Sequence, residues 1–332
     1  MGSCPLCRQN SAIRLFQSRD RVHHLAGIFT IFRCQQCRAI FIGPWPSNEE
    51  LAAYYPEHYG PYRHSRSLEK QNCVGLKRFV LEHFYGYPLV QSRSRSLLKA
   101  RIAFLLSYVT AKGTIPYRGS GYFLDVGCGG GSYLHRLKQR GWNVYGVEPS
   151  AAGTAQARSL GINVCHGYIE DARFPDGFFD VIRLHHVLEH LTAPQATLRE
   201  IARILKPDGL VYVTVPNTQS FNFWLFGANW YALDAPRHVI SYCPKSLAFL
   251  CQATGFEIRK VRYQSGAFNF VRSVRYHLEE QGKQWPRWVH GINWPSNKLI
   301  RRALKPFFLL MDRFRLGDVM LALLQKRVSS VS

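Results

Sequence analysis

The sequence predicts an α/β fold, in which helices cover both faces of a mostly parallel sheet, with a small metal-binding module in front of it. Three observations lead to this fold class. An apolar run ends in Asp125 and passes directly into the glycine-rich turn 127–131. Downstream, apolar runs of strand length alternate with helical patterns, which is typical of β-α units in a parallel sheet. Near the N-terminus stand two Cys-x-x-Cys pairs.

Residues 1–43 are expected to form a zinc-ribbon-like module. The four cysteines of the two pairs are Cys4, Cys7, Cys34 and Cys37. Four thiolates can surround Zn²⁺ tetrahedrally, and they leave no open coordination position, so the predicted zinc is structural rather than catalytic. The segment between the pairs is longer than in most zinc ribbons, but its stretch 27–33 reads as a strand. Free thiols or a redox pair are the alternatives.

The overall charge is strongly positive, with 43 Lys and Arg residues against 21 Asp and Glu residues. This balance indicates an anionic partner, which could be nucleic acid, an anionic lipid surface or a phosphorylated substrate; a merely basic, soluble surface is the plainer reading. No apolar run reaches the ~18 residues of a membrane span, and the first residues lack the apolar centre of a signal peptide. We therefore expect a cytoplasmic location, with peripheral membrane contact as an option.

A connector and a helical lid are predicted over residues 44–113. Ser47 and Glu50 form a capping-box pattern that begins a short helix. Proline and glycine density after that helix marks a boundary. From Leu97 to Leu106, apolar residues recur at helical spacing and predict a helix before the first core strand.

The alternating core covers residues 114–264. Strands are expected at 121–126, 143–147, 162–165, 179–184, 209–215 and 256–263. Helices are expected at 131–140, 150–160, 193–205 and 244–254. Ligands of such sheets bind beyond the carboxyl ends of the strands, and Asp125, Glu148 and His185 fall at those ends.

Two classes of ligand compete for the glycine-rich turn. A dinucleotide would favour Gly-x-Gly-x-x-Gly, but Ser132 stands at the third glycine position. The charge of Asp125 would repel a pyrophosphate and favour a cationic ligand such as S-adenosylmethionine (AdoMet). Glu148 ends the second strand, close to the ~20-residue offset at which a carboxylate reaches ribose hydroxyls. The turn and the two acids together favour AdoMet.

The stretch from Tyr122 to Phe256 resembles the class I AdoMet-dependent methyltransferases. The matching segments are 124–129, 146–150, 179–182, 186–190 and 205–209. The resemblance implies a Rossmann-like, seven-stranded sheet whose last strand, within 317–332, is antiparallel and lies beside the fifth. It also implies the cofactor-binding residues, which are Asp125, Gly127, Cys128, Gly129, Glu148, Pro149, Tyr168, Ile169, Glu170 and His185. Many relatives carry Asp where this chain has Tyr168, so Glu170 or Asp171 would accept from the adenine amine.

The fourth strand leads into a histidine-rich segment. Some relatives hold a divalent metal there with Glu-x-x-Glu-His and a later histidine; this chain has His186 at the first Glu position, and His238 could be the later ligand. The catalytic candidates are therefore His186, His190 and His238. They could act as a general base, form a metal site together with Glu189, or only orient the backbone.

Residues 217–243 form an insertion in the position where the family places substrate-recognition elements. Trp230, Tyr231 and Arg237 are the substrate candidates, with Arg237 as a partner for a carboxylate or phosphate. Residues 265–316 combine tryptophans and phenylalanines with a basic run, a composition typical of an interfacial segment; RNA contact or ordinary packing are the alternatives.

The predicted function is an AdoMet-dependent methyltransferase with a structural zinc, acting on a small-molecule or lipid-linked acceptor such as a sugar, polyketide or quinone precursor. An RNA methyltransferase is the first alternative, although no stacking-aromatic RNA module is found in the sequence. A non-catalytic binding scaffold is the second. No residue pattern indicates an oligomeric state.

Overall fold

The computed structural model describes residues 3–55, 75–89, 96–110, 114–283 and 298–327. The chain divides into two compact units. The first unit comprises residues 1–56, 184–202 and 211–332, and the second comprises residues 57–183 and 203–210. The predicted N-terminal module thus belongs to the same unit as the C-terminal third of the chain.

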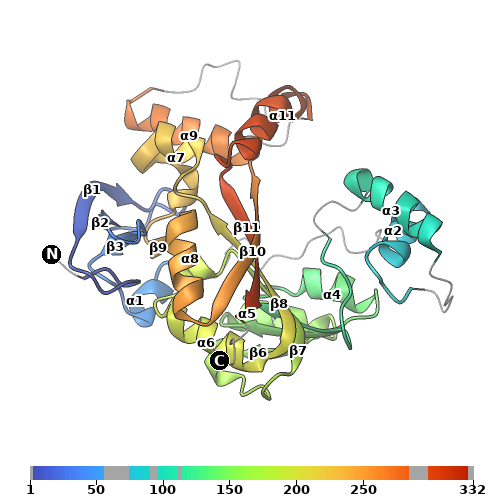
Figure 1. Ribbon diagram of the computed structural model, residues 1–332. Coiled ribbons are helices and arrows are strands. Elements are labelled where there is room, and N and C mark those ends of the chain that lie inside the picture. Colours follow the sequence, from blue (N-terminus) through green and yellow to red (C-terminus); the bar gives the residue numbers. More distant parts are fainter. Residues whose placement is uncertain (1–2, 56–74, 90–95, 111–113, 284–297, 328–332) are drawn as a thin grey trace, which may run out of the picture. The chain divides into compact units, whose positions relative to one another are not determined.

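A Rossmann-like sheet of seven strands, in the order β10-β11-β8-β7-β4-β5-β6, is the central element of the fold (Figure 1). The strands are β4 (Tyr122–Val126), β5 (Asn143–Glu148), β6 (Asn163–His166), β7 (Phe179–His185), β8 (Leu205–Pro216), β10 (Phe256–Gln264) and β11 (Val319–Lys326). The strand order reverses between β4 and β7, and ligands of open α/β sheets bind at such a point.

In the second unit, β4 pairs with β5 and β5 pairs with β6, all parallel. Helices α4 (Ser132–Lys138) and α5 (Ala151–Ser159) follow β4 and β5 and pack against the strands. Their predicted positions are confirmed to within a few residues. Ser150 begins α5 by accepting a hydrogen bond from the Gly153 amide, a side-chain cap that stabilises a helix by about 1 kcal/mol.

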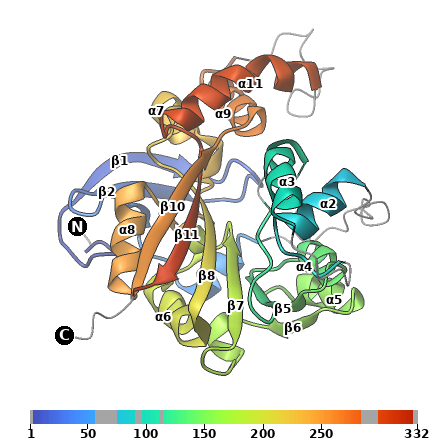
Figure 2. The same ribbon diagram turned by 45° about the vertical axis from the view of Figure 1, so that its right-hand side comes forward.

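In the first unit, β11 lies between β10 and β8 and is antiparallel to both (Figure 2). This confirms the prediction that the last strand is antiparallel and lies beside the fifth predicted strand, β8. Helix α8 (Pro244–Ala253) packs on β10, and α6 (Pro194–Ile204) precedes β8.

A second sheet of four strands lies next to the N-terminal cysteines, one of which, Cys34, ends its second strand. Its order is β1 (Ala12–Arg19), β2 (Ile28–Cys34), β3 (Ile40–Gly43) and β9 (Ile240–Ser241). Strand β9 belongs to the predicted substrate insertion, and its pairing with β3 was not anticipated. The predicted capping box is confirmed: the Ser47 hydroxyl accepts from the Glu50 amide and the Glu50 carboxylate accepts from the Ser47 amide, at the start of α1 (Asn48–Ala52).

The described residues also form five helices not yet placed. They are α2 (Leu76–His83), α3 (Leu97–Thr110), α7 (Phe221–Phe226), α9 (Ala267–Glu280) and α11 (Lys298–Arg313). Helices α2 and α3 pack on each other, as do α7 and α11 on α9. The tryptophans at 285, 288 and 294 lie outside the described residues. Among the described residues, no helix combines the length and the apolar character that crossing a bilayer requires.

A buried ion pair joins the N-terminal sheet to the insertion. The side chains of Arg237 and Asp20 are fully buried. Arg237 donates to both oxygens of Asp20, at 2.7 and 3.0 Å, to both oxygens of Asp234, and to the Tyr54 carbonyl. All five guanidinium N–H groups therefore have acceptors, and segments far apart in the sequence are held together.

Candidate functional sites

The glycine-rich turn has the backbone conformation that the sequence predicts. Gly127, Gly129 and Gly131 have φ values of +68°, +53° and +74°, which residues with a Cβ rarely adopt. The amides of Gly127 and Cys128 both donate to the Val147 carbonyl, at 2.8 and 3.1 Å, and so attach the turn to β5. The turn is a rigid loop of bare backbone at the carboxyl end of β4.

Cys128 packs inside this turn. A Cβ built on Gly146 would approach the Cys128 sulfur to 2.6 Å, so the glycine in β5 makes room for the thiol. Burial, with the charges of Asp125 and Glu148 beside it, raises the pKa of the Cys128 thiol well above its ordinary range. The side chain is an unreactive filler, and its backbone remains the part that can face a ligand.

The sequence argument treated Asp125 as an isolated acid, but the structure pairs it with an arginine. Arg183, from β7, donates from Nη1 to both carboxylate oxygens at 2.9 Å, and Asp125 is nearly fully buried. The ring of Tyr133 lies against the guanidinium, at 4.0 Å from its carbon. Burial raises the pKa of Asp125, and the Arg183 charge opposes that rise. The strand ends thus present one negative and one positive group rather than a lone acid.

Glu148 is tied to the turn by its carboxylate. One oxygen accepts from the Gly129 amide at 2.8 Å and the other from the Ser150 amide at 2.9 Å. Each carboxylate oxygen can accept further hydrogen bonds, so two hydroxyl donors could still be bound. Burial raises the pKa of Glu148, while the two amide bonds lower it.

The loop after β6 places the residues predicted to contact adenine. Ile169 is buried and begins a short 3₁₀ turn. Asp171 accepts from the Tyr168 amide at 2.9 Å, which commits that oxygen to the turn, and Glu170 is exposed beside it. His166, just before the turn, lies 3.1 Å from the Pro149 carbonyl and so connects this loop to the end of β5.

Glu189, His190 and His238 form a separate cluster in the first unit. One ligand atom from each lies within 4.8 Å of the others, and the two imidazole rings meet edge to face with centroids 4.6 Å apart. Residues 188–190 form a 3₁₀ turn. His186, with a φ of +56°, instead directs its Nδ1 to the other oxygen of Glu189, at 2.9 Å. The structure brings together only two of the three predicted catalytic histidines. His185 is exposed at the last position of β7.

Hydrogen bonds to carbonyl groups determine which ring nitrogen carries the proton. His238 Nδ1 lies 2.8 Å from the Ala232 carbonyl, and His190 Nδ1 lies 3.0 Å from the Arg237 carbonyl and 2.8 Å from the Tyr55 hydroxyl. Because a carbonyl only accepts, a neutral His238 carries its proton on Nδ1 and keeps a lone pair on Nε2. His190 Nδ1 faces both a carbonyl, which accepts, and a hydroxyl, which can donate or accept.

One carboxylate oxygen of this cluster lacks a hydrogen-bond partner among the described residues. Glu189 is fully buried, and its Oε2 has no hydrogen-bond partner among the described residues. Burial would raise the pKa of Glu189, but the hydrogen bond and charge of His186 and the two other imidazoles lower it to about 2. Burial, then the neighbouring His238, lowers the pKa of His190 to about 4. A carboxylate and two imidazoles oriented by backbone carbonyls are the donor set of many metal sites.

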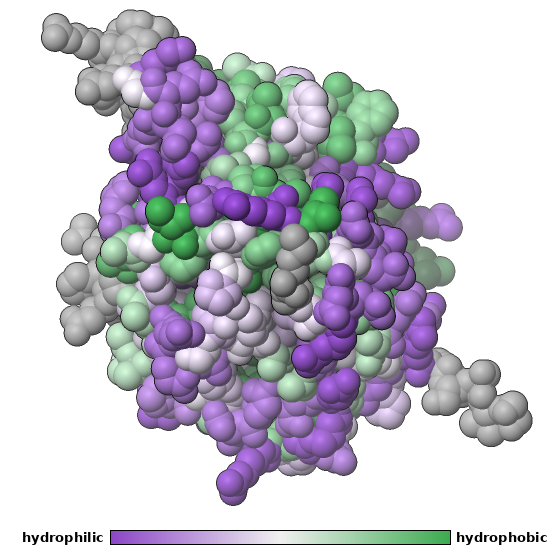
Figure 3. All heavy atoms as spheres, turned by 90° about the vertical axis from the view of Figure 1, so that its left-hand side faces the viewer, coloured by the Kyte–Doolittle hydropathy of each residue, from purple (hydrophilic) through white to green (hydrophobic). Residues whose placement is uncertain are grey.

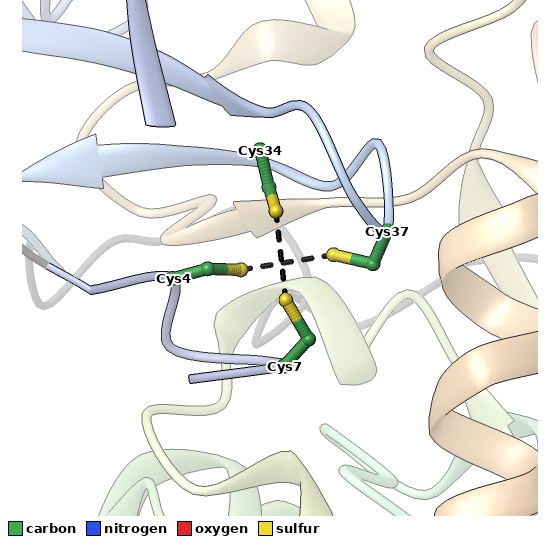
Figure 4. A group of neighbouring side chains, drawn as sticks. All are labelled: Cys4, Cys7, Cys34 and Cys37. Carbon is green, nitrogen blue, oxygen red and sulfur yellow. Dashed lines mark hydrogen bonds between the residues drawn. The ribbon is translucent and has the colours of Figure 1, made fainter. Parts of the chain in front are cut away.

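The four N-terminal cysteines converge on one point (Figure 4). The sulfur atoms of Cys4 and Cys37 are 3.7 Å apart, and those of Cys7 and Cys34 are 3.5 Å apart. Disulfides would require about 2 Å, whereas tetrahedral Zn²⁺ with bonds of about 2.3 Å separates its sulfurs by about 3.8 Å. All four sulfur atoms lie within 4.8 Å of one another. The residues therefore fit a structural zinc.

The predicted substrate residues mostly make contacts with other residues of the protein. Trp230 is buried, and its Nε1 donates to Asp318 at 3.3 Å. Arg237 is saturated by carboxylates, so it has no donor left for a substrate carboxylate or phosphate; this corrects the role that the sequence suggested. Tyr231 is half-buried and packs with Phe268, at 5.4 Å between ring centroids.

Comparison with known proteins identifies the family. Residues 78–261 match the family described as a methyltransferase domain, and the chain belongs to the class I AdoMet-dependent methyltransferases. It is 29% identical over 151 residues to the ubiquinone biosynthesis O-methyltransferase of Pseudomonas aeruginosa (strain UCBPP-PA14), a match that covers 42% of this chain and 65% of the relative. Thus the chain spans just under two thirds of that relative's length.

Two further similarities are of the same kind. The ubiquinone biosynthesis O-methyltransferase of Paraburkholderia xenovorans (strain LB400) is 31% identical over 168 residues, which are 46% of this chain and 72% of the relative. A solved SAM-dependent methyltransferase from Archaeoglobus fulgidus shares 22% identity with a TM-score of 0.43, and the match covers 70% of this chain and 95% of that one.

Sequence reasoning missed two charged residues that the structure makes prominent. Arg183 lies in the second half of β7. A basic residue near the end of a strand, in a sheet whose neighbouring strand ends in Asp125, is a signal from which the ion pair could have been predicted. Asp20 lies in a turn of the N-terminal module, and nothing in the local sequence connects it to Arg237.

Proposed function

We propose that the protein transfers a methyl group from AdoMet to a small-molecule or lipid-linked acceptor, such as a sugar, polyketide or quinone-like precursor. The single observation that carries the proposal is the pairing of Asp125 with Arg183 next to the glycine-rich turn. The methionine end of AdoMet carries an ammonium and a carboxylate, so an acid and a guanidinium complement it better than a lone acid would.

Other residues of the same unit support the rest of the cofactor. The free lone pairs of the Glu148 carboxylate suit ribose hydroxyls, and Tyr168, Ile169 and Glu170 form the loop proposed for adenine. Bound AdoMet supplies a methyl group on a sulfonium; the chain has to hold it in line with the acceptor and exclude water. A quinone-like acceptor is favoured by the names of the two relatives, both of which are ubiquinone biosynthesis O-methyltransferases.

The function can be tested by incubating the protein with methyl-labelled AdoMet and cell extract, then separating lipid, small-molecule and RNA fractions. We expect label in the lipid or small-molecule fraction, reduced at least ~100-fold by Glu148→Ala because the variant loses the carboxylate that holds both the turn and the ribose. Label in RNA would favour the alternative of an RNA methyltransferase, which the positive net charge of the chain also suggests. Failure to bind AdoMet by calorimetry would leave a binding scaffold.

We further propose that Glu189, His190 and His238 hold a divalent cation, with His186 orienting Glu189. One possible ligand atom from each of these residues lies within 4.8 Å of the others. Among the described residues, the buried Glu189 Oε2 has no donor, and such an oxygen is costly unless a cation satisfies it. A general base would need only one of these groups. The cation would polarise an acceptor hydroxyl and lower its pKa.

The cation site predicts that Mg²⁺ or Mn²⁺ binds the zinc-loaded protein, and that Glu189→Gln or His238→Ala weakens binding at least ~100-fold, since each removes a ligand. Calorimetric titration measures this, with His277→Ala on α9 as the matched control. If metal binding is absent but His190→Ala lowers turnover ~100-fold or more, the histidine acts as a general base. Unchanged turnover in both histidine variants would show that the cluster is only structural.

A further inference from the structure

The helices α7 and α11 expose large apolar side chains beside basic ones. Trp224 on α7 is 77% exposed, and Leu299, Leu310 and Phe314 on or just after α11 are 73%, 51% and 64% exposed. Folded proteins rarely leave such side chains together on the surface without a function. Figure 3 shows apolar side chains gathered at the upper end of the view, the end where Figure 1 draws α7, α9 and α11.

The exposed apolar residues of α11 lie on one side of the helix. Leu299, Ala303, Pro306 and Leu310 recur at spacings of four, three and four, so they share one side of the helix, and all four are exposed. Phe308 is buried on the other side, where it packs against Phe270 of α9 at 6.1 Å between ring centroids. The apolar sector of the helix is therefore wider than the part that packing covers.

Basic residues border the exposed apolar side. Residues 298–316 contain six Lys and Arg residues and one acidic residue, Asp312. Arg302, Lys305 and Arg313 are exposed, and within the described part of the chain no carboxylate pairs with them. Asp312 is turned inward and accepts from the Ser265 hydroxyl at 2.7 Å. The surface thus combines uncompensated positive charge with apolar area.

Helix α7 extends the same surface. Phe221 of α7 packs edge to face on Phe307 of α11, with ring centroids 5.4 Å apart. This contact leaves Trp224 and Leu225 pointing outward. A tryptophan next to leucines and arginines is the composition found where proteins meet the head-group region of a bilayer.

We propose that this α7–α11 surface, formed by Trp224, Leu299, Leu310, Phe314, Arg302 and Arg313, docks on an anionic lipid bilayer. The exposed apolar side chains would enter the acyl boundary, and the arginines would meet lipid phosphates. An interface between two protein copies would have to bury the same uncompensated arginines against each other, so the charge favours the bilayer. Docking does not depend on the acceptor being a lipid.

Vesicle co-sedimentation of the full-length, zinc-loaded protein tests the proposal. We expect binding to vesicles of phosphatidylcholine mixed with phosphatidylglycerol, little binding to phosphatidylcholine alone, and weaker binding at high salt. Each basic residue near an anionic surface contributes about 1 kcal/mol, or about fivefold. The double variant Arg302→Gln/Arg313→Gln should therefore bind about 25-fold more weakly, and Leu310→Ser should also bind more weakly.

The matched control is Arg199→Gln/Lys245→Gln, which removes two exposed charges from α6 and α8. An equal loss in this control would mean that only net charge matters, and the proposal would be overturned. Absence of binding to the anionic vesicles would overturn it as well. So would a dimer that Leu310→Ser converts to a monomer, because the surface would then join two copies. AdoMet binding by each variant shows that it is folded, and methyl transfer is not the readout.

Discussion

We propose that Cys4, Cys7, Cys34 and Cys37 hold a structural zinc, and we expect its removal to unfold the N-terminal sheet. Replacing Cys37 with serine removes one of four ligands, and structural zinc contributes about 10–16 kcal/mol of apparent binding energy in small zinc-dependent domains. That is as large as the whole stability of a typical domain. Strands β1 and β2 have few buried apolar residues of their own besides Cys34, namely Ala12 and Ile31, whereas Ile40, Phe41 and Ile42 of β3 are buried. Without the metal, little would hold the ends of β1 and β2 in place.

The measurement combines zinc content with amide hydrogen exchange over residues 12–43. Wild-type protein should carry one zinc per chain and protect these amides, whereas Cys37→Ser should lose both the metal and the protection. Cys165→Ser is the matched control, since Cys165 lies on β6 outside the cluster. Wild-type protein that purifies without zinc, with four titratable thiols and full protection, would contradict the prediction.

Replacing Asp20 with alanine is expected to destabilise the protein by about 3–5 kcal/mol, the usual cost of leaving one partner of a buried ion pair behind. Arg237 would keep its charge inside the fold with only Asp234 to balance it. The surface pair of Asp176 and Arg203 provides the control, because the Asp176 side chain is 80% exposed and its replacement by alanine should cost at most about 1 kcal/mol. Urea unfolding measures both.

The same pair predicts a dependence of stability on pH. Burial would raise the pKa of Asp20, but hydrogen bonds from Arg237 and two amides, together with the Arg237 charge, lower it to about 2 from 3.8. The stabilisation is thus complete above about pH 4 and is lost as the pH falls toward 2, by about 2 kcal/mol. Asp20→Asn should lack this acid-dependent step. If Asp20→Ala and Asp176→Ala destabilise equally, the pair does not have the importance that its burial indicates.

The sequence by itself determined the features that depend on neighbouring residues. The β-α alternation, the positive-φ glycines after β4, the capping box at Ser47 and the paired cysteines are all local patterns, because backbone conformation and ligand spacing are set within a few residues. Charge and spacing, and then the family resemblance, predicted that Asp125 and Glu148 contact the cofactor, and this assignment stays a prediction.

Only the tertiary structure decided which distant side chains meet. It paired Asp125 with Arg183, filled the donors of Arg237 with Asp20 and Asp234, and placed β9 beside β3. It also left His186 outside the group of Glu189, His190 and His238, although His186 contacts Glu189. The physical reason is that the sequence shows which residues are charged but not which of them become buried. Burying an unpaired charge costs so much free energy that each buried charge must have a partner, and only the tertiary structure shows which one.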